Sequence, residues 1–443
     1  MPKFARSAKF DVLAFHEAFA DLVALFQHFS MPEVLTHQLT RTRGELRAHS
    51  LLGQLATQFG SATGLRGALR DAIGRYDKAA ERWSPHEPEP GEYARTAEPH
   101  ARGAILVAAI FDAFLAIYER RSEDLVRIAS GGTGVLPDGR LHPDLVSRLA
   151  REAAKTAGHF LTLCIRALDY CPPFDITFGE YLRAMITGDR DLVADDPYGY
   201  RVPLIEAFRR RGIYPRDVRT LSEDSLTWRP PGDHQRRAFS FLEPYLAKLR
   251  ERFADWDLEN DRKRLWEVGR GQRRLLERMI KRRRAPGASA GDEIEATYHH
   301  LGMSLAIDGG RFKVHSLRPA RRTGPDGQHI LELVAELTQQ RPIFFRQDGS
   351  ADFPARWSSR RARRCHAWFR GGCTLLIDIA KGEIRYCIHK GIDGLRRPER
   401  QIAFQHELLA RSLRATYLGA RGMLEAEPFA LLHRYGAEEY GDG

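Results

Sequence analysis

The stretch FDVLAFHEAFADLVALF, residues 10–26, decides how the first half of this chain folds. Between Val12 and Phe26 its only polar side chains are those of His16, Glu17 and Asp21. So many apolar residues over four turns predict a helix that is buried on most sides. At about 100° per residue, Glu17 and Asp21 share one stripe of that helix. A buried carboxylate needs a cation, a metal or hydrogen bonds, so we expect either arginine partners or a metal site.

The helical pattern extends over residues 1–214, where Ala, Leu and Phe recur at helical spacing between loops rich in Gly and Pro. We interpret this part as a helical bundle. Residues 215–289 contain a Pro-rich connector and then strongly charged helices, ending in the small-residue segment APGASAGDE. The bundle and the connector make the chain mostly α.

The periodicity changes after that segment. Residues 290–395 contain alternating apolar runs rich in β-branched residues, and Lys381-Gly382 is a plausible turn between two antiparallel strands. We expect a small β-rich α+β domain there. Residues 396–443 then predict one closing helix and a tail, with an apolar stripe made of Leu408, Leu409, Leu413, Tyr417 and Leu418. The expected fold class is therefore α+β, mostly α, in a multidomain chain.

Composition indicates a soluble protein, with 43% hydrophobic and 29% charged residues. No uninterrupted apolar run has the roughly 18 residues of a membrane span, and MPKFARSAKF lacks the apolar core of a secretory signal. We therefore expect a cytoplasmic location and no membrane partner.

Two segments are strongly basic. Residues 262–284 hold eleven Lys or Arg against two Glu, and residues 356–364 read RWSSRRARR. Each segment contains a tryptophan. These segments predict either solvated helix faces or a surface for nucleic acid or an acidic protein.

The segment HEAFADLVALF resembles a helix of the thermolysin-like zinc metallopeptidases (gluzincins), which carries the pattern N-E-A-x-S-D. Glu17, Ala18 and Asp21 match this pattern, whereas His16 and Ala20 depart from it. The resemblance implies that Glu17 is the third zinc ligand. It implies also that Asp21 orients a zinc-bound histidine from outside the ligand shell.

Three more segments resemble the same family, in the family's order, so that the resemblance covers residues 11–214. EPHARGAILVAAIFDAF resembles the helix that begins with a catalytic histidine, which implies that His100 stabilises the oxyanion, although Gly103 lies one position closer than usual. The other two segments are CIRALDYCPPFDITFGEYLRAM and LIEAFRRRGIY. If the resemblance is right, His100 begins a second helix and lies within roughly 10 Å of Glu17, because both groups serve one site.

The motif that supplies the other two zinc ligands and the general base, H-E-x-x-H, is absent. His-Glu occurs three times, and the fourth residue after each His is Ala20, Pro90 or Ala410. We therefore expect a partial or remnant zinc metallopeptidase, inactive by itself, which would hydrolyse peptides or proteins only if a complete site exists. We expect no zinc in this chain alone. The alternative is a non-catalytic protein that binds nucleic acid or an acidic partner through residues 262–284 and 356–364.

Overall fold

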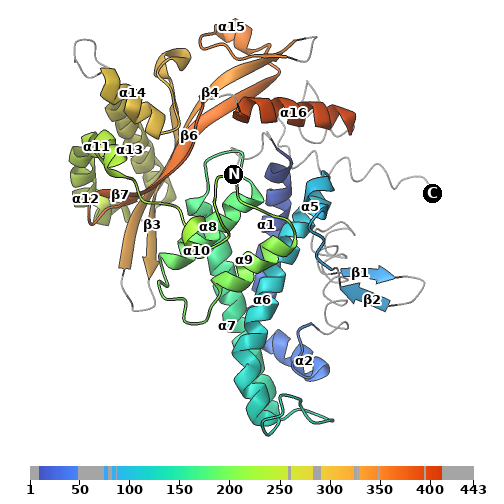
Figure 1. The fold of residues 1–443 in the computed structure, drawn as a ribbon. Helices are drawn as coiled ribbons and strands as arrows, with labels where there is room; N and C mark the ends of the chain where they lie inside the picture. Colours follow the sequence, from blue (N-terminus) through green and yellow to red (C-terminus); the bar gives the residue numbers. More distant parts are fainter. Residues whose placement is uncertain are drawn as a thin grey trace.

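The computed structural model describes residues 9–47, 74–77, 82–85, 87–257, 261–282, 291–323, 327, 329–346, 350–393 and 396–411. It is mostly helical with one main antiparallel sheet, which confirms the expected α+β class. A lobe of helices packs on one face of the sheet, and a second group of helices packs on the other face (Figure 1).

The lobe is built around three long helices, α1 (Phe10–Phe29), α6 (Pro99–Ala129) and α7 (Pro143–Ala167). Its shorter elements are α2 (Pro32–Thr42), α5 (Glu92–Arg95), η2 (Leu168–Tyr170), α8 (Phe178–Arg190) and α9 (Arg201–Arg210). Local sequence explains where several of them begin. Helices α6 and α7 both start with proline in the first turn, and Thr177 with Glu180 forms a capping box at the start of α8. The buried helix expected at residues 10–26 is confirmed as α1.

One short element in the lobe was not expected. Strands β1 (Gly74–Asp77) and β2 (Arg82–Pro85) form an antiparallel hairpin where the sequence predicts an almost wholly helical region. Their sequences, GRYD and RWSP, combine Gly and Pro with the aromatic residues that favour strands. Local propensity therefore opposes a helix at this point.

The main sheet has the strand order β3–β4–β6–β7, and β5 pairs with the end of β4. Its strands are β3 (Lys313–Thr323), β4 (His329–Phe345), β5 (Ala351–Asp352), β6 (Ala367–Asp378) and β7 (Glu383–Lys390). Strands β6 and β7 form the hairpin expected around Lys381-Gly382. Gly382 has φ of 70°, a conformation that favours glycine.

The two faces of the sheet belong to different cores. Alternate residues such as Cys373, Leu375 and Ile377 pack against α11 (Asp233–Phe239), η3 (Ser240–Leu242), α12 (Glu243–Asp257), α13 (Arg262–Arg282) and α14 (Gly291–His300). The intervening Leu376, with Tyr386 and Ile388 of β7, joins the core of the helical lobe. The sheet is thus buried on both sides, and the helical lobe shares its core with the sheet.

The remaining helices are short or terminal. Helix α10 (Glu223–Leu226) packs against the lobe. We call the main sheet, with the helices α11–α14 on its other face, the sheet domain; η4 (Ile307–Gly310) and α15 (Ser359–Ala362) belong to it. Helix α16 (Arg396–Ala410) begins the predicted closing helix, and its Leu408 packs against Leu13 of α1. The predicted stripe residues Leu413, Tyr417 and Leu418 lie outside the described residues, as do residues 283–290.

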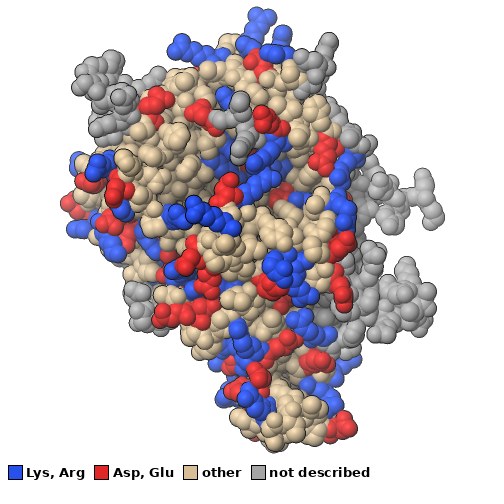
Figure 2. All heavy atoms as spheres, in the orientation of Figure 1, with Lys and Arg blue, Asp and Glu red and all other residues tan. Residues whose placement is uncertain are grey.

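Helix α6 alone, within the described chain, is long and apolar enough to cross a membrane. However, 83% of its apolar window is buried inside the protein. That burial is typical of a core helix, since the apolar side chains already have protein neighbours. On the face drawn in Figure 2, Lys and Arg alternate with Asp and Glu, so this face has no single dominant basic patch.

Candidate functional site

Helix α1 presents a carboxylate at the edge of the lobe core. Most of the apolar side chains of α1 are fully buried, and the Glu17 side chain keeps only 12% of its surface exposed. Asp21 lies one turn further along and is half-buried. Both residues thus lie on one largely buried helix, as the sequence predicts.

His100 faces this carboxylate from the first turn of α6. Glu98 caps that helix by accepting a hydrogen bond from the backbone N–H of Ala101, and Pro99 follows it. The Nδ1 of His100 lies 3.3 Å from Oε2 of Glu17, and the His100 side chain is 22% exposed. The expected juxtaposition of Glu17 and His100 is confirmed. Among the described residues Glu17 thus contacts a histidine rather than an arginine.

The surroundings of His100 and His16, the residue next to Glu17, shift the pKa values of the two imidazoles in opposite directions. Contact with the Glu17 carboxylate raises the pKa of His100, and the charges of Glu17, Glu98 and Asp21 act in the same direction against the effect of burial. Burial, by contrast, lowers the pKa of His16 to about 4. His16 is therefore neutral near pH 7, while His100 holds its proton to a higher pH than an ordinary histidine.

The residues around Glu17 provide one possible zinc ligand but not a complete zinc site. The Oε1 of Glu17 is buried and has no hydrogen-bond partner among the described residues, so this oxygen could accept a cation. Across the described residues, however, no group of three or more His, Cys, Asp or Glu side chains could hold a metal ion. A zinc site at Glu17 would therefore need further ligands.

Comparison with protein-family models, with curated proteins and with solved structures finds no match for this chain. No comparison therefore tests the resemblance to thermolysin-like peptidases, which stays a prediction from the four sequence segments.

The other segments of the resemblance lie in the same lobe core. Tyr170 is fully buried, and its hydroxyl donates a 2.6 Å hydrogen bond to Asp191. Arg183 donates to the backbone oxygen of Leu226 and stacks on Trp228, with 3.7 Å between the guanidinium carbon and the ring centroid. The contacts of Tyr170 and Arg183 thus hold parts of the lobe together.

Sequence reasoning missed the residue that anchors α1. Asp11 is buried, and its carboxylate accepts hydrogen bonds from Arg102 at 2.6 Å, from the Tyr93 hydroxyl at 2.6 Å and from the backbone N–H of Phe178 at 3.0 Å. These partners come from α6, α5 and α8. Because Asp11 and Glu17 lie on one helix, as Arg102 and His100 do, this network fixes the two site residues relative to each other. The sequence did show an acidic residue in the first turn of an apolar helix, which could have indicated a buried carboxylate. It could not show the partners of Asp11, because they are distant in the sequence.

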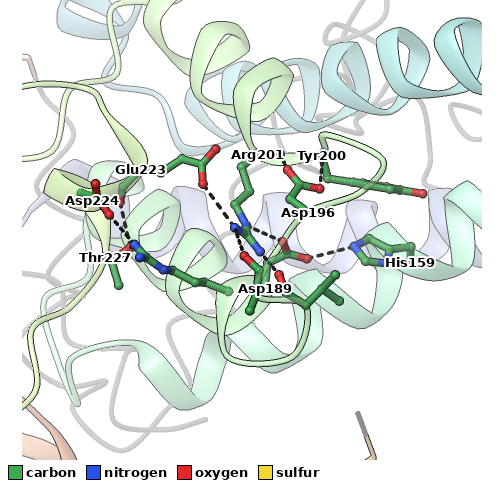
Figure 3. Close-up of polar contacts among 11 residues, drawn as sticks. His159, Asp189, Asp196, Tyr200, Arg201, Glu223, Asp224 and Thr227 are labelled. Atoms are coloured by element: carbon green, nitrogen blue, oxygen red, sulfur yellow. Dashed lines mark hydrogen bonds and ion pairs between the residues drawn. The ribbon is translucent and has the colours of Figure 1, made fainter. Parts of the chain in front are cut away.

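A second buried network lies in the lobe, among α7, α8 and α9 (Figure 3). Asp189 accepts from Arg201 at 2.8 Å and lies 3.1 Å from the imidazole of His159, while Arg201 also contacts Glu223 at 3.2 Å. Asp196 accepts from the backbone N–H groups of Tyr200 and Arg201 where α9 begins. The network ties the loop between α8 and α9 to the lobe, so we assign it a structural role.

The charge of His100 gives a testable pH dependence. The folded protein holds the His100 proton more tightly than the unfolded chain does, so the contact with Glu17 stabilises the fold below about pH 6.5. This contribution is lost as the pH rises through the higher pKa of the folded state. We expect Glu17→Gln to lower the pKa of His100, because the substitution removes the largest cause of its upward shift.

Nuclear magnetic resonance titration of the imidazole protons measures this pKa directly. His300 of α14 serves as an internal control, because burial lowers its pKa and Glu17 does not contribute to that shift, so its titration should not change. An unchanged His100 titration in Glu17→Gln would show that the two side chains do not interact in solution.

Proposed function

We propose that residues 11–214 form the helical half of a zinc metallopeptidase site, and that this half requires an H-E-x-x-H segment for peptide hydrolysis. The observation that carries the proposal is the 3.3 Å contact between His100 and Glu17, two residues that the resemblance assigns to one site. We propose a cytoplasmic location, since the apolar window of α6 is mostly buried.

Three side chains have distinct roles in this proposal. Glu17 would supply the third ligand through the carboxylate oxygen that has no hydrogen-bond partner among the described residues. Asp21, one turn away, would orient a histidine ligand by accepting its N–H. His100 donates its proton as a hydrogen bond to the oxyanion that forms at the scissile carbonyl. Its raised pKa supports this role, because the imidazole stays charged closer to neutral pH. When bound, zinc would activate a water molecule and polarise the peptide carbonyl.

The gene itself offers the first test. In this family H-E-x-x-H lies about two dozen residues before the third ligand, so the sequence of the gene in frame upstream of the codon for Glu17 tests whether the motif is encoded at that distance. A chain that includes this segment should cleave an internally quenched peptide. His100→Asn should lower kcat about 10²-fold or more with a smaller change in KM, as expected for the loss of an oxyanion donor.

A matched control is His142→Asn, which makes the same change at an exposed position and should leave kcat unchanged. Absence of H-E-x-x-H from the upstream codons would reject the peptidase and leave an inactive remnant. Full activity in His100→Asn would reject the assigned role of His100.

A further inference from the structure

Helix α13, Arg262–Arg282, separates its apolar and basic residues onto opposite faces. Leu276 and Ile280 are buried against the sheet, with Leu265, Val268 and Met279 beside them. Arg273 donates a 3.0 Å hydrogen bond to the backbone oxygen of His315 in β3. The apolar face of α13 therefore packs against the sheet domain.

The opposite face carries a row of cations, which we call the α13 stripe: Lys263, Arg270, Arg274 and Arg278. All four are exposed, and at about 100° per residue they fall within a sector of roughly 80°. None of them has an ion-pair partner among the described residues. Glu267 is the one carboxylate in the sector with an exposed side chain. Like charges four residues apart destabilise a helix, so an anion bound along the stripe would relieve this repulsion.

An aromatic ring borders the stripe. Trp266 is 56% exposed, and no other tryptophan whose side chain is described is exposed. The guanidinium carbon of Arg270 lies 4.5 Å from its ring centroid, a cation–π contact that holds the ring beside the cations. A flat, exposed ring next to a guanidinium is suited to stacking a nucleobase while the cation contacts a phosphate.

We propose that the α13 stripe and Trp266 bind single-stranded nucleic acid. Arg270, Arg274 and Arg278 recur about every 6 Å along the helix axis, so the stripe can follow a backbone with one negative charge per nucleotide. A membrane surface fits less well, because an interfacial helix inserts its apolar face, and the apolar face of α13 packs against the sheet. The inference does not depend on the peptidase proposal, since no residue of that site takes part.

The test is fluorescence anisotropy of the full chain with a labelled single-stranded RNA of mixed sequence at 50 to 200 mM NaCl. Four phosphate contacts predict a slope of about −3 for log K against log salt, which is a loss of about 50-fold over this range. Exchanging all four stripe cations for glutamine should remove this salt dependence and weaken binding at 50 mM NaCl by about 50-fold or more. Trp266→Ala should keep the slope but weaken binding about tenfold.

The matched control removes the same charge from scattered positions of the helical lobe, by exchanging Arg41, Arg127, Arg151 and Arg210 for glutamine. This variant should bind within about threefold of the unaltered chain. Circular dichroism and the Tm of each variant establish that it folds, since all eight positions are exposed. The proposal is overturned if the control variant loses as much affinity as the stripe variant. It is overturned equally if the chain binds anionic phosphatidylserine vesicles or an acidic peptide but not RNA.

Discussion

Asp11→Asn is expected to lower the free energy of unfolding of the helical lobe by about 3–5 kcal/mol, because it removes the charge that compensates a buried arginine. The Asp11 side chain is 4% exposed and the Arg102 side chain 9%. The amide keeps the shape of the carboxylate but leaves the guanidinium without its ion-pair partner, although Arg102 still donates to the backbone oxygens of Tyr93 and Thr96. Urea denaturation followed by circular dichroism measures the loss.

The matched control is Glu123→Gln, which also exchanges an acid for its amide. Glu123 pairs with Arg127 one turn along α6, and both side chains are more than half exposed. An exposed pair of this kind contributes about 0.3–0.5 kcal/mol. If Asp11→Asn were as mild as Glu123→Gln, the Asp11 network would not hold α1 in place.

Glu332→Gln is the second substitution with a large expected effect, of about 3 kcal/mol. Glu332 lies in β4 at the contact with the helical lobe, and its side chain is fully buried. Its carboxylate is 3.0 Å from Arg322 and also pairs with Arg385. These arginines contact Asp169 and Asp191 of the lobe at 3.1 Å and 2.8 Å. Glu332→Gln therefore removes the carboxylate that Arg322 and Arg385 share, and leaves each guanidinium paired only with an aspartate of the lobe.

The readout is hydrogen exchange of β3 and β7, which should become faster if the lobe and the sheet separate more readily. Asp352→Asn is the control in the same domain, because its pair with Arg361 is partly exposed to solvent and should contribute less than about 1 kcal/mol. Equal exchange in Glu332→Gln and Asp352→Asn would contradict the structural role of the buried network.

Much of the fold was predictable because its signals are local. Apolar density over residues 10–26 predicted α1, and Lys381-Gly382 predicted the hairpin of β6 and β7. The juxtaposition of Glu17 and His100 was predictable only through the family resemblance, because 82 residues separate them in the sequence.

The partners of buried charges were not predictable. Asp11 pairs with a residue 91 positions away, and Arg322 in β3 reaches Asp169 in the lobe across 153 positions. A single sequence contains no signal for such pairs, since many arginines could serve equally well. The sequence also did not predict that the lobe and the sheet share one core. The pattern of β6 and β7 indicates that both faces of these strands are buried, but it does not indicate which elements pack on each face.

The most direct measurement for the central claim is the zinc content of the chain with and without an H-E-x-x-H segment, after dialysis. We predict no retained zinc for the 443-residue chain alone and one equivalent for the chain that includes the segment, because tight binding needs several ligands in fixed geometry. Glu17→Gln should abolish retention in the longer chain, whereas Glu123→Gln should leave it intact. One equivalent of zinc retained by the longer chain despite Glu17→Gln would contradict the assignment of Glu17 as the third ligand.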